Sequence, residues 1–174
     1  MYSQKLSSRS SRKSKTLETL MVVLSEKTEI YDISLAGKLY DIGKITVPLE
    51  TLNKPSKLTT DEFNLVKRHS EAGYKIVFNL MSSNTIAEGF LYHHKHYDGS
   101  GYPYGLKGKE IPLYARIISV SDAFDAMTSN RPYGPEISVR AATNELISHK
   151  STQFAPEIVD AIIEVLKEEE LLDK

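Results

Sequence analysis

The 174-residue sequence contains no cysteine. This absence excludes disulfide bonds and every metal site built on thiolates, so a metal ion in this protein must bind through histidine and carboxylate side chains. Such donors suit zinc, iron, manganese or nickel better than copper(I) or an iron–sulfur cluster. The composition alone therefore restricts the kind of metal centre that the chain can build.

Long apolar runs and an excess of charge of one sign are also missing. No run approaches the roughly 20 residues of a membrane span, and the N-terminus has no apolar signal-peptide region. Lys and Arg number 22 against 23 for Asp and Glu, and a net charge of −1 says little about partners. We expect a soluble cytoplasmic protein that uses neither a membrane nor a nucleic acid as its partner.

The chain divides into a short tail and one domain. Residues 1–15 are rich in serine and basic residues and contain no acid, which is typical of a disordered tail. A nucleic-acid or membrane-surface arm is the alternative, but no aromatic interleaving supports it. Residues 16–174 are long enough to bury a core, and we expect a single domain there.

Apolar residues recur at helical spacing through most of the chain, and no strand pattern competes with them. Thr59 and Glu62 form a capping box, Ser138 and Pro156 suit the starts of two later helices, and Gly43 suits a C-terminal cap. The sequence predicts an all-α bundle of about six or seven helices. The expected helices cover about 17–27, 34–42, 60–80, 85–94, 113–127, 138–149 and 156–166.

Three histidines lie on apolar helix faces. His69 follows Val66 by three residues, and that pattern by itself favours a core histidine bonded to a backbone carbonyl. His93 and His94 continue the spacing of Ile86 and Phe90, so both point inward. Burying two imidazoles without partners is costly, and a metal ion is one remedy, with hydrogen-bonded core histidines as the alternative.

Other polar residues are assigned by the same patterns. His96 and His149 lie off the apolar faces, and we expect both at the surface. Asp122 and Asp125 are one turn apart in an otherwise apolar helix, so they require a metal, another cation or a histidine.

The helix that contains Phe63 and Leu80 is expected to turn these residues inward. The charged tail at 167–174 is expected to fray.

A set of motifs, taken together and in order, resembles the HD-GYP family, a branch of the HD phosphohydrolase superfamily. The resemblance runs from about Lys15 to about Val165. It implies an all-helical, metal-dependent phosphodiesterase that hydrolyses cyclic di-GMP with two or three iron, manganese or similar ions. The motifs are Asp41-Ile42-Gly43-Lys44, His69, His93-His94, Asp98-Gly99-Ser100-Gly101-Tyr102-Pro103, Arg116-Ile117, Asp122-Ala123-Phe124-Asp125-Ala126 and Arg131-Pro132-Tyr133.

The resemblance also implies roles for single residues. Asp41 corresponds to the Asp of the family's His-Asp pair, with Lys44 beside it as a second catalytic residue. Substrate contacts are implied for Lys44, for the loop residues Gly101, Tyr102 and Pro103, and for Arg131. The implied metal ligands are Asp41, His69, His93, His94 and Asp122.

Two departures from the family pattern affect one metal position. Tyr40 stands where the family has the His of the pair, and no histidine precedes His69. The sequence around 28–31 is also shorter than in the family, and Gly134 replaces a usual basic residue. We therefore expect one iron, manganese or similar ion per chain rather than two.

These departures leave three functions open. The first is a cyclic di-GMP phosphodiesterase with reduced activity, since the second metal also stabilises the breaking diester. The second is an inactive module that binds cyclic di-GMP or a signalling partner, and the third is a truncated relic. Removing helical sequence uncovers apolar surface, so we also expect a homodimer or a partner chain.

Overall fold

The computed structural model describes residues 36–81, 83–103, 105–129, 136–169 and 171–172. Residues 36–39 are helical, and no residue in these ranges belongs to a strand beyond two isolated bridges. The all-α prediction is confirmed. The elements in order are η1 (Ile42–Thr46), α3 (Leu49–Leu52), α4 (Thr60–Met81), α5 (Asn84–Tyr92), η2 (Gly108–Glu110), α6 (Leu113–Thr128), α7 (Val139–Ser148) and α8 (Pro156–Glu168).

Several predictions lie outside the described residues. They concern the tail at 1–15, the helix at 17–27, and the turn that contains Arg131, Tyr133 and Gly134. Among the described helices, none combines the length and the apolar character that a membrane crossing requires.

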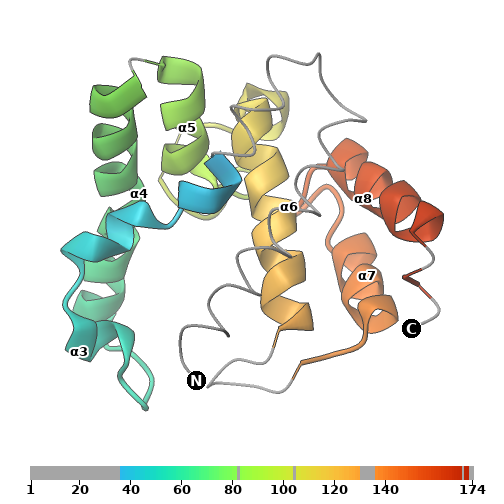
Figure 1. Ribbon diagram of the computed structural model, residues 1–174, viewed down its shortest axis with the longest axis horizontal. Coiled ribbons are helices and arrows are strands. Elements are labelled where there is room, and N and C mark those ends of the chain that lie inside the picture. Colours follow the sequence, from blue (N-terminus) through green and yellow to red (C-terminus); the bar gives the residue numbers. More distant parts are fainter. Residues whose placement is uncertain (1–35, 82, 104, 130–135, 170, 173–174) are drawn as a thin grey trace.

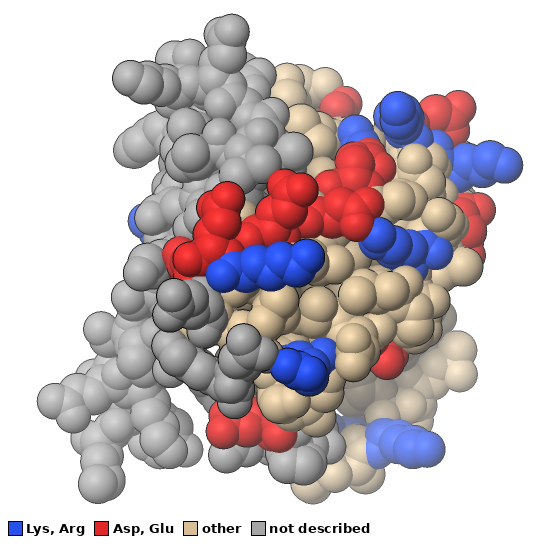
Figure 2. Space-filling view, turned by 90° about the vertical axis from the view of Figure 1, so that its right-hand side faces the viewer, with Lys and Arg blue, Asp and Glu red and all other residues tan. Residues whose placement is uncertain are grey.

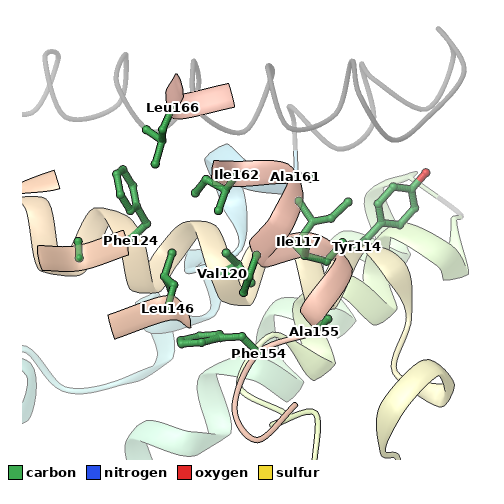
Figure 3. Packing of buried hydrophobic residues seen from close by; sticks show 13 residues of the cluster. Tyr114, Ile117, Val120, Phe124, Leu146, Phe154, Ala155, Ala161, Ile162 and Leu166 are labelled. Carbon is green, nitrogen blue, oxygen red and sulfur yellow. The ribbon is translucent and has the colours of Figure 1, made fainter. Parts of the chain in front are cut away.

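Helix α6 lies at the centre of the molecule, between α4 and α5 on one side and α7 and α8 on the other (Figure 1). One face of α6 packs on α7 and α8 through Ile117, Val120 and Phe124, and Figure 3 shows these side chains against Leu146 and Ile162. Burying a side chain of this size stabilises the fold by about 1.5–3 kcal/mol. This larger cluster holds α6, α7 and α8 together, and α4 and α5 pack against the opposite face of α6.

A second, smaller cluster lies on the other side of α6. Ile118 of α6 packs there with Phe90 and Ile86 of α5, Val77 of α4, and Tyr40. These contacts hold α4 and α5 against α6. The residues that carry the sequence motifs, from Asp41 to His94, therefore belong to this smaller half.

The helix starts agree with their sequence signals. The Thr59 backbone N–H donates to the Glu62 carboxylate at 2.7 Å, and the Glu62 N–H donates to the Thr59 hydroxyl at 3.2 Å, which completes the capping box. The Ser138 hydroxyl accepts from the Ala141 N–H at 3.2 Å, and Pro156 is the first residue of α8. These three predictions are confirmed.

The prediction that Phe63 and Leu80 face the core was wrong at both ends of α4. Phe63 is 46% exposed and Leu80 is 77% exposed, whereas His69, Gly73 and Val77 are buried. The buried residues repeat every four positions because η1 and α5 pack along that stripe. Phe63 precedes His69 by six residues, which turns it about a third of a revolution away.

Two further expectations are corrected. Gly43 does not cap a helix in the left-handed conformation, because it lies inside η1 and is buried. The tail after α8 does not simply fray, since Leu171 and Leu172 are partly buried against the larger core cluster. Their apolar side chains keep them on the core although charged residues surround them in sequence.

The outer face of α8 is acidic. Figure 2 shows a row of Asp and Glu side chains on the face at the right of Figure 1, with a few Lys and Arg beside it. Two acids of α8 are paired with neighbouring segments: Lys150 bonds Asp160, and Arg116 of α6 bonds Glu157. Arg116, which belongs to a family motif, therefore ties α6 to α8.

Candidate metal centre

Three histidines from two helices meet in the smaller half. His69 comes from α4, His93 ends α5, and His94 follows it. One ring nitrogen of each lies within 4.8 Å of the others, and the Nε2 atoms of His69 and His93 are 3.3 Å apart. His69 and His93 are each 1% exposed. These three histidines could hold a metal ion.

Backbone hydrogen bonds fix the tautomers of two of these rings. Nδ1 of His69 donates to the Val66 carbonyl at 2.6 Å, and Nδ1 of His93 donates to the Phe90 carbonyl at 2.7 Å. A carbonyl oxygen only accepts, so each Nδ1 carries the proton and each Nε2 presents a lone pair. Two lone pairs that face each other at 3.3 Å repel one another, and a cation between them would remove this repulsion.

The rings do not supply that cation by taking up a proton. Burial lowers the pKa of His93 to about 4 and the pKa of His94 to about 2. Burial also lowers the pKa of His69. Neutral imidazoles at pH 7 are the form that ligates metals. Hydrogen-bonded core histidines, the alternative from the sequence, account for the Nδ1 atoms of His69 and His93 and leave both Nε2 atoms unexplained.

Asp41 adds a carboxylate to this group. Its Oδ1 lies 3.7 Å from Nε2 of His69 and is buried without a hydrogen-bond partner. Its Oδ2 accepts from Nζ of Lys44 at 2.7 Å, which holds the carboxylate in place. A buried carboxylate oxygen without a donor is costly. Three neutral imidazoles and this oxygen form a donor set that fits a divalent transition metal.

Gly43 explains how Asp41 comes to lie beside His69. A Cβ at Gly43 would lie 1.8 Å from the His69 carbonyl oxygen and 2.6 Å from the Gly73 nitrogen. Only glycine therefore allows the backbone of η1 to lie directly on α4. The sequence analysis missed this role, although the signal was available: a glycine stands between Asp41 and Lys44.

Tyr40 faces the same histidines from the other side. It is 3% exposed, and its ring lies edge-on to His93 with 5.4 Å between the ring centres. Its hydroxyl donates to Oδ1 of Asp122 on α6 at 2.5 Å. Burial and the nearby Asp122 carboxylate raise the pKa of this phenol far above its ordinary value, so it stays neutral. One partner of Asp122 is thus a phenol, which was not among the partners predicted from the sequence. The hydroxyl of Ser129 donates to Asp125 at 3.2 Å.

The glycine-rich loop folds back onto His94. Gly101 has a φ of +77°, and a Cβ there would lie 2.4 Å from the His94 carbonyl oxygen. That carbonyl accepts from the Tyr102 N–H at 3.2 Å, and the Tyr102 ring centre lies 4.8 Å from that of His94. Burial raises the pKa of the Tyr102 phenol, which keeps it a neutral donor. Tyr102, which a cis peptide bond joins to Pro103, thus stands directly beside His94.

Residues without a predicted role shape this loop. Lys95 is 3% exposed, and its Nζ donates to the Gly99 carbonyl at 2.6 Å. The Asp98 carboxylate accepts from the N–H and the hydroxyl of Ser100 at 2.8 and 2.7 Å, and these bonds lower the pKa of Asp98. The His96 side chain bonds the Ser100 hydroxyl at 2.9 Å.

Outside this loop, the side chain of His149 is 44% exposed, as predicted.

The chain is similar to known proteins along most of its length. The cyclic di-GMP phosphodiesterase response regulator RpfG of Xanthomonas campestris is 45% identical over 143 residues, which are 80% of this chain and 37% of the relative. A cyclic di-GMP phosphodiesterase of Thermotoga maritima is 41% identical over 143 residues, which are 80% of this chain and 38% of the relative. This chain therefore spans well under half the length of each of these relatives.

A solved structure supports the fold. The crystal structure of a cyclic GMP-AMP specific phosphodiesterase of Vibrio cholerae, V-cGAP3, matches with a TM-score of 0.70 at 17% identity, over 95% of this chain and 45% of that chain. Residues 1–158 match the family described as HD domain. The helical fold, the three clustered histidines and this match agree with the resemblance seen in the motifs, and the chain belongs to the HD domain family.

Proposed function

We propose that this chain is a metal-dependent phosphodiesterase domain that hydrolyses a phosphodiester bond of cyclic di-GMP. The observation that supports it most is the unpartnered Oδ1 of Asp41 beside the facing Nε2 lone pairs of His69 and His93. A bound cation would satisfy these atoms, and the relatives from Xanthomonas and Thermotoga carry this activity in their names.

The proposed ligands are Asp41, His69, His93 and His94. A divalent ion held by them would lower the pKa of water and neutralise charge on the phosphoryl oxygens. Lys44 would keep Asp41 oriented through its ion pair with Oδ2, and its half-exposed ammonium would face a substrate phosphate. Tyr102, with its phenol protonated, would donate to the same phosphate group. Gly101 and Pro103 would position Tyr102, and Arg131 remains a proposed phosphate contact.

We further propose one iron, manganese or similar ion per chain. The hydroxyl of Tyr40 donates to Asp122, so a neutral phenol stands where a second ligand set would be needed. Asp122 remains a proposed ligand through the carboxylate lone pairs that the Tyr40 hydroxyl does not use. One ion held by Asp41 and the histidines would supply activation of water but not the second clamp on the diester, so we expect reduced turnover.

The second candidate function is a module that binds cyclic di-GMP without hydrolysing it. The Tyr40–Asp122 hydrogen bond favours this candidate, because it satisfies the acid without a metal. The homodimer or partner chain and the cytoplasmic location stay predictions.

Turnover and metal content test the proposal together. We expect the protein, purified without chelator, to contain about one transition ion per chain. Cyclic di-GMP should be hydrolysed when Mn²⁺ or Fe²⁺ is added. The double variant His93→Ala/His94→Ala should lose the ion and at least about 100-fold in rate, since it removes two ligands of the activating ion.

Each other outcome has a distinct meaning. Two ions per chain would contradict the single-site proposal. Turnover no faster than the double variant, together with binding of cyclic di-GMP in calorimetry, would select the binding module. Neither turnover nor binding would reject both functions.

A further inference from the structure

We propose that Phe63, Lys67 and Tyr102 form a platform for a purine base at the edge of the metal centre. This inference rests on the proposed function, since it names how the same site would hold a cyclic dinucleotide. It gives roles to Phe63 and Lys67, two side chains of α4 that no motif singled out.

The three side chains form a corner. The ring centres of Phe63 and Tyr102 lie 6.4 Å apart, and the ring planes are nearly perpendicular at 85°. Nζ of Lys67 lies 4.6 Å from the centre of the Phe63 ring and 5.7 Å from that of Tyr102. Two perpendicular rings with a cation beside both offer stacking to the face of a base and charge to its acceptor atoms.

The platform lies next to the three histidines. The Tyr102 ring centre lies 4.8 Å from His94 and 6.5 Å from His69, so one ring separates Phe63 from the metal ligands. A base stacked on Phe63 would leave its attached phosphate beside Tyr102 and the histidines. The same substrate would thus reach the platform and the proposed reaction centre at once.

Exposure distinguishes Phe63 from the core aromatics. It is 46% exposed, so part of the ring is accessible to a ligand, whereas Phe90 in the same half of the molecule is 1% exposed. A single exposed phenylalanine is ordinary in a folded protein. Its position between a cation and a tyrosine of the candidate site is what indicates a ligand.

Phe78 provides a matched control on the same helix. It is 42% exposed, and it stacks on Tyr74 with 5.8 Å between the ring centres. It lies nine residues, or two and a half turns, beyond His69 along α4. Replacing Phe63 or Phe78 removes a similar amount of exposed ring, but only Phe63 belongs to the proposed platform.

Affinity for cyclic di-GMP tests the platform. We expect Phe63→Ala to weaken binding by about 10- to 100-fold, as for the loss of one base–aromatic stack, and Phe63→Tyr to restore it. Lys67→Gln should weaken binding less, and Phe78→Ala should change it by less than about twofold. None of these variants should change the affinity for inorganic phosphate, which has no base.

A second readout does not depend on hydrolysis. The chain has no tryptophan, so Phe63→Trp and Phe78→Trp each introduce a single reporter. Cyclic di-GMP should quench the fluorescence of the first and leave the second unchanged. Equal affinity of Phe63→Ala and Phe78→Ala, or equal quenching of both reporters, overturns the platform while the proposed function stands. Failure of the wild-type protein to bind cyclic di-GMP overturns both.

Discussion

The two sides of the candidate site differ in how their polar atoms are satisfied. On the side of His69 and His93, two lone pairs and one carboxylate oxygen face each other without a hydrogen. On the side of Tyr40, the neutral phenol donates a hydrogen bond to the Asp122 carboxylate. The histidine side therefore has atoms that a cation could satisfy, whereas the tyrosine side already has its donor.

This difference shows how one substitution changes a metal position. A histidine at position 40 would present a lone pair, whereas the buried phenol of Tyr40 presents a proton that its raised pKa retains. With tyrosine at position 40, the opposing Asp122 carboxylate accepts a hydrogen bond in place of the ion that a histidine would help to bind. Three predictions act on one side at a time, and they follow from the largest expected effect to the smallest.

Acid should destabilise the metal-free protein through the histidine side. Burial lowers the folded-state pKa of His93 to about 4 and of His94 to about 2, below the ordinary 6.5. The unfolded chain therefore binds protons first as the pH falls. The stability is full above about pH 6.5 and is lost progressively as the pH falls toward 4 for His93 and toward 2 for His94. The loss is roughly 1.4 kcal/mol per pH unit for each histidine, or about 4 kcal/mol for both at pH 5.

Urea unfolding in chelator at pH 7, 6 and 5 measures this loss. The double variant His93→Gln/His94→Gln is the control, because its amides do not titrate. Tyr40 stays protonated over the whole range and should add no slope. The same slope in the double variant would assign the acid sensitivity to other groups.

Gly43→Ala should break the contact that sets Asp41 beside His69. Its Cβ would overlap the His69 carbonyl, so η1 must move away from α4. We expect a loss of about 3 kcal/mol, or about 10 °C in melting temperature, together with weaker metal binding.

Gly73→Ala is the matched control for this contact. A Cβ at Gly73 would find no atom closer than 3.5 Å, and alanine favours the helix by up to about 1 kcal/mol. It should leave the melting temperature unchanged or raise it. If both variants melt alike, the close approach at Gly43 does not position the site.

Tyr40→Phe should act on the other side alone. It removes the hydroxyl that donates to Asp122 and costs about 1.5 kcal/mol of stability, as for a hydrogen bond to a charged acceptor. The ion content should stay at its wild-type value, because the proposed ligands come from the histidine side. Loss of the ion in Tyr40→Phe would mean that the two sides are not independent.

Much of the fold follows from local patterns. The helices from 60 to 168 and the caps at Thr59, Ser138 and Pro156 agree with the sequence because caps and periodicity depend on neighbours within a turn or two. The face of α4 was assigned wrongly at Phe63 and Leu80, since η1 and α5 decide which stripe is buried.

The candidate site was only partly predictable. The inward direction of His93 and His94 follows from helical spacing, but the identity of the partners does not. Tyr40 and Asp122 are 82 residues apart, and nothing local brings the phenol to that acid. The platform at Phe63 was likewise hidden, because its other ring comes from the loop at Tyr102.

By itself, the sequence determined an all-α chain without thiolate chemistry and with three inward histidines, and its resemblance to the HD-GYP family marked Tyr40 as standing where that family has another histidine. Composition and periodicity are local properties, so they can be read without coordinates. Only the tertiary structure decided that Gly43 lays Asp41 against His69, and that the Tyr40 hydroxyl donates a hydrogen bond to Asp122. Such contacts depend on how α4, α5 and α6 pack, and that packing is fixed by the whole core rather than by any one segment.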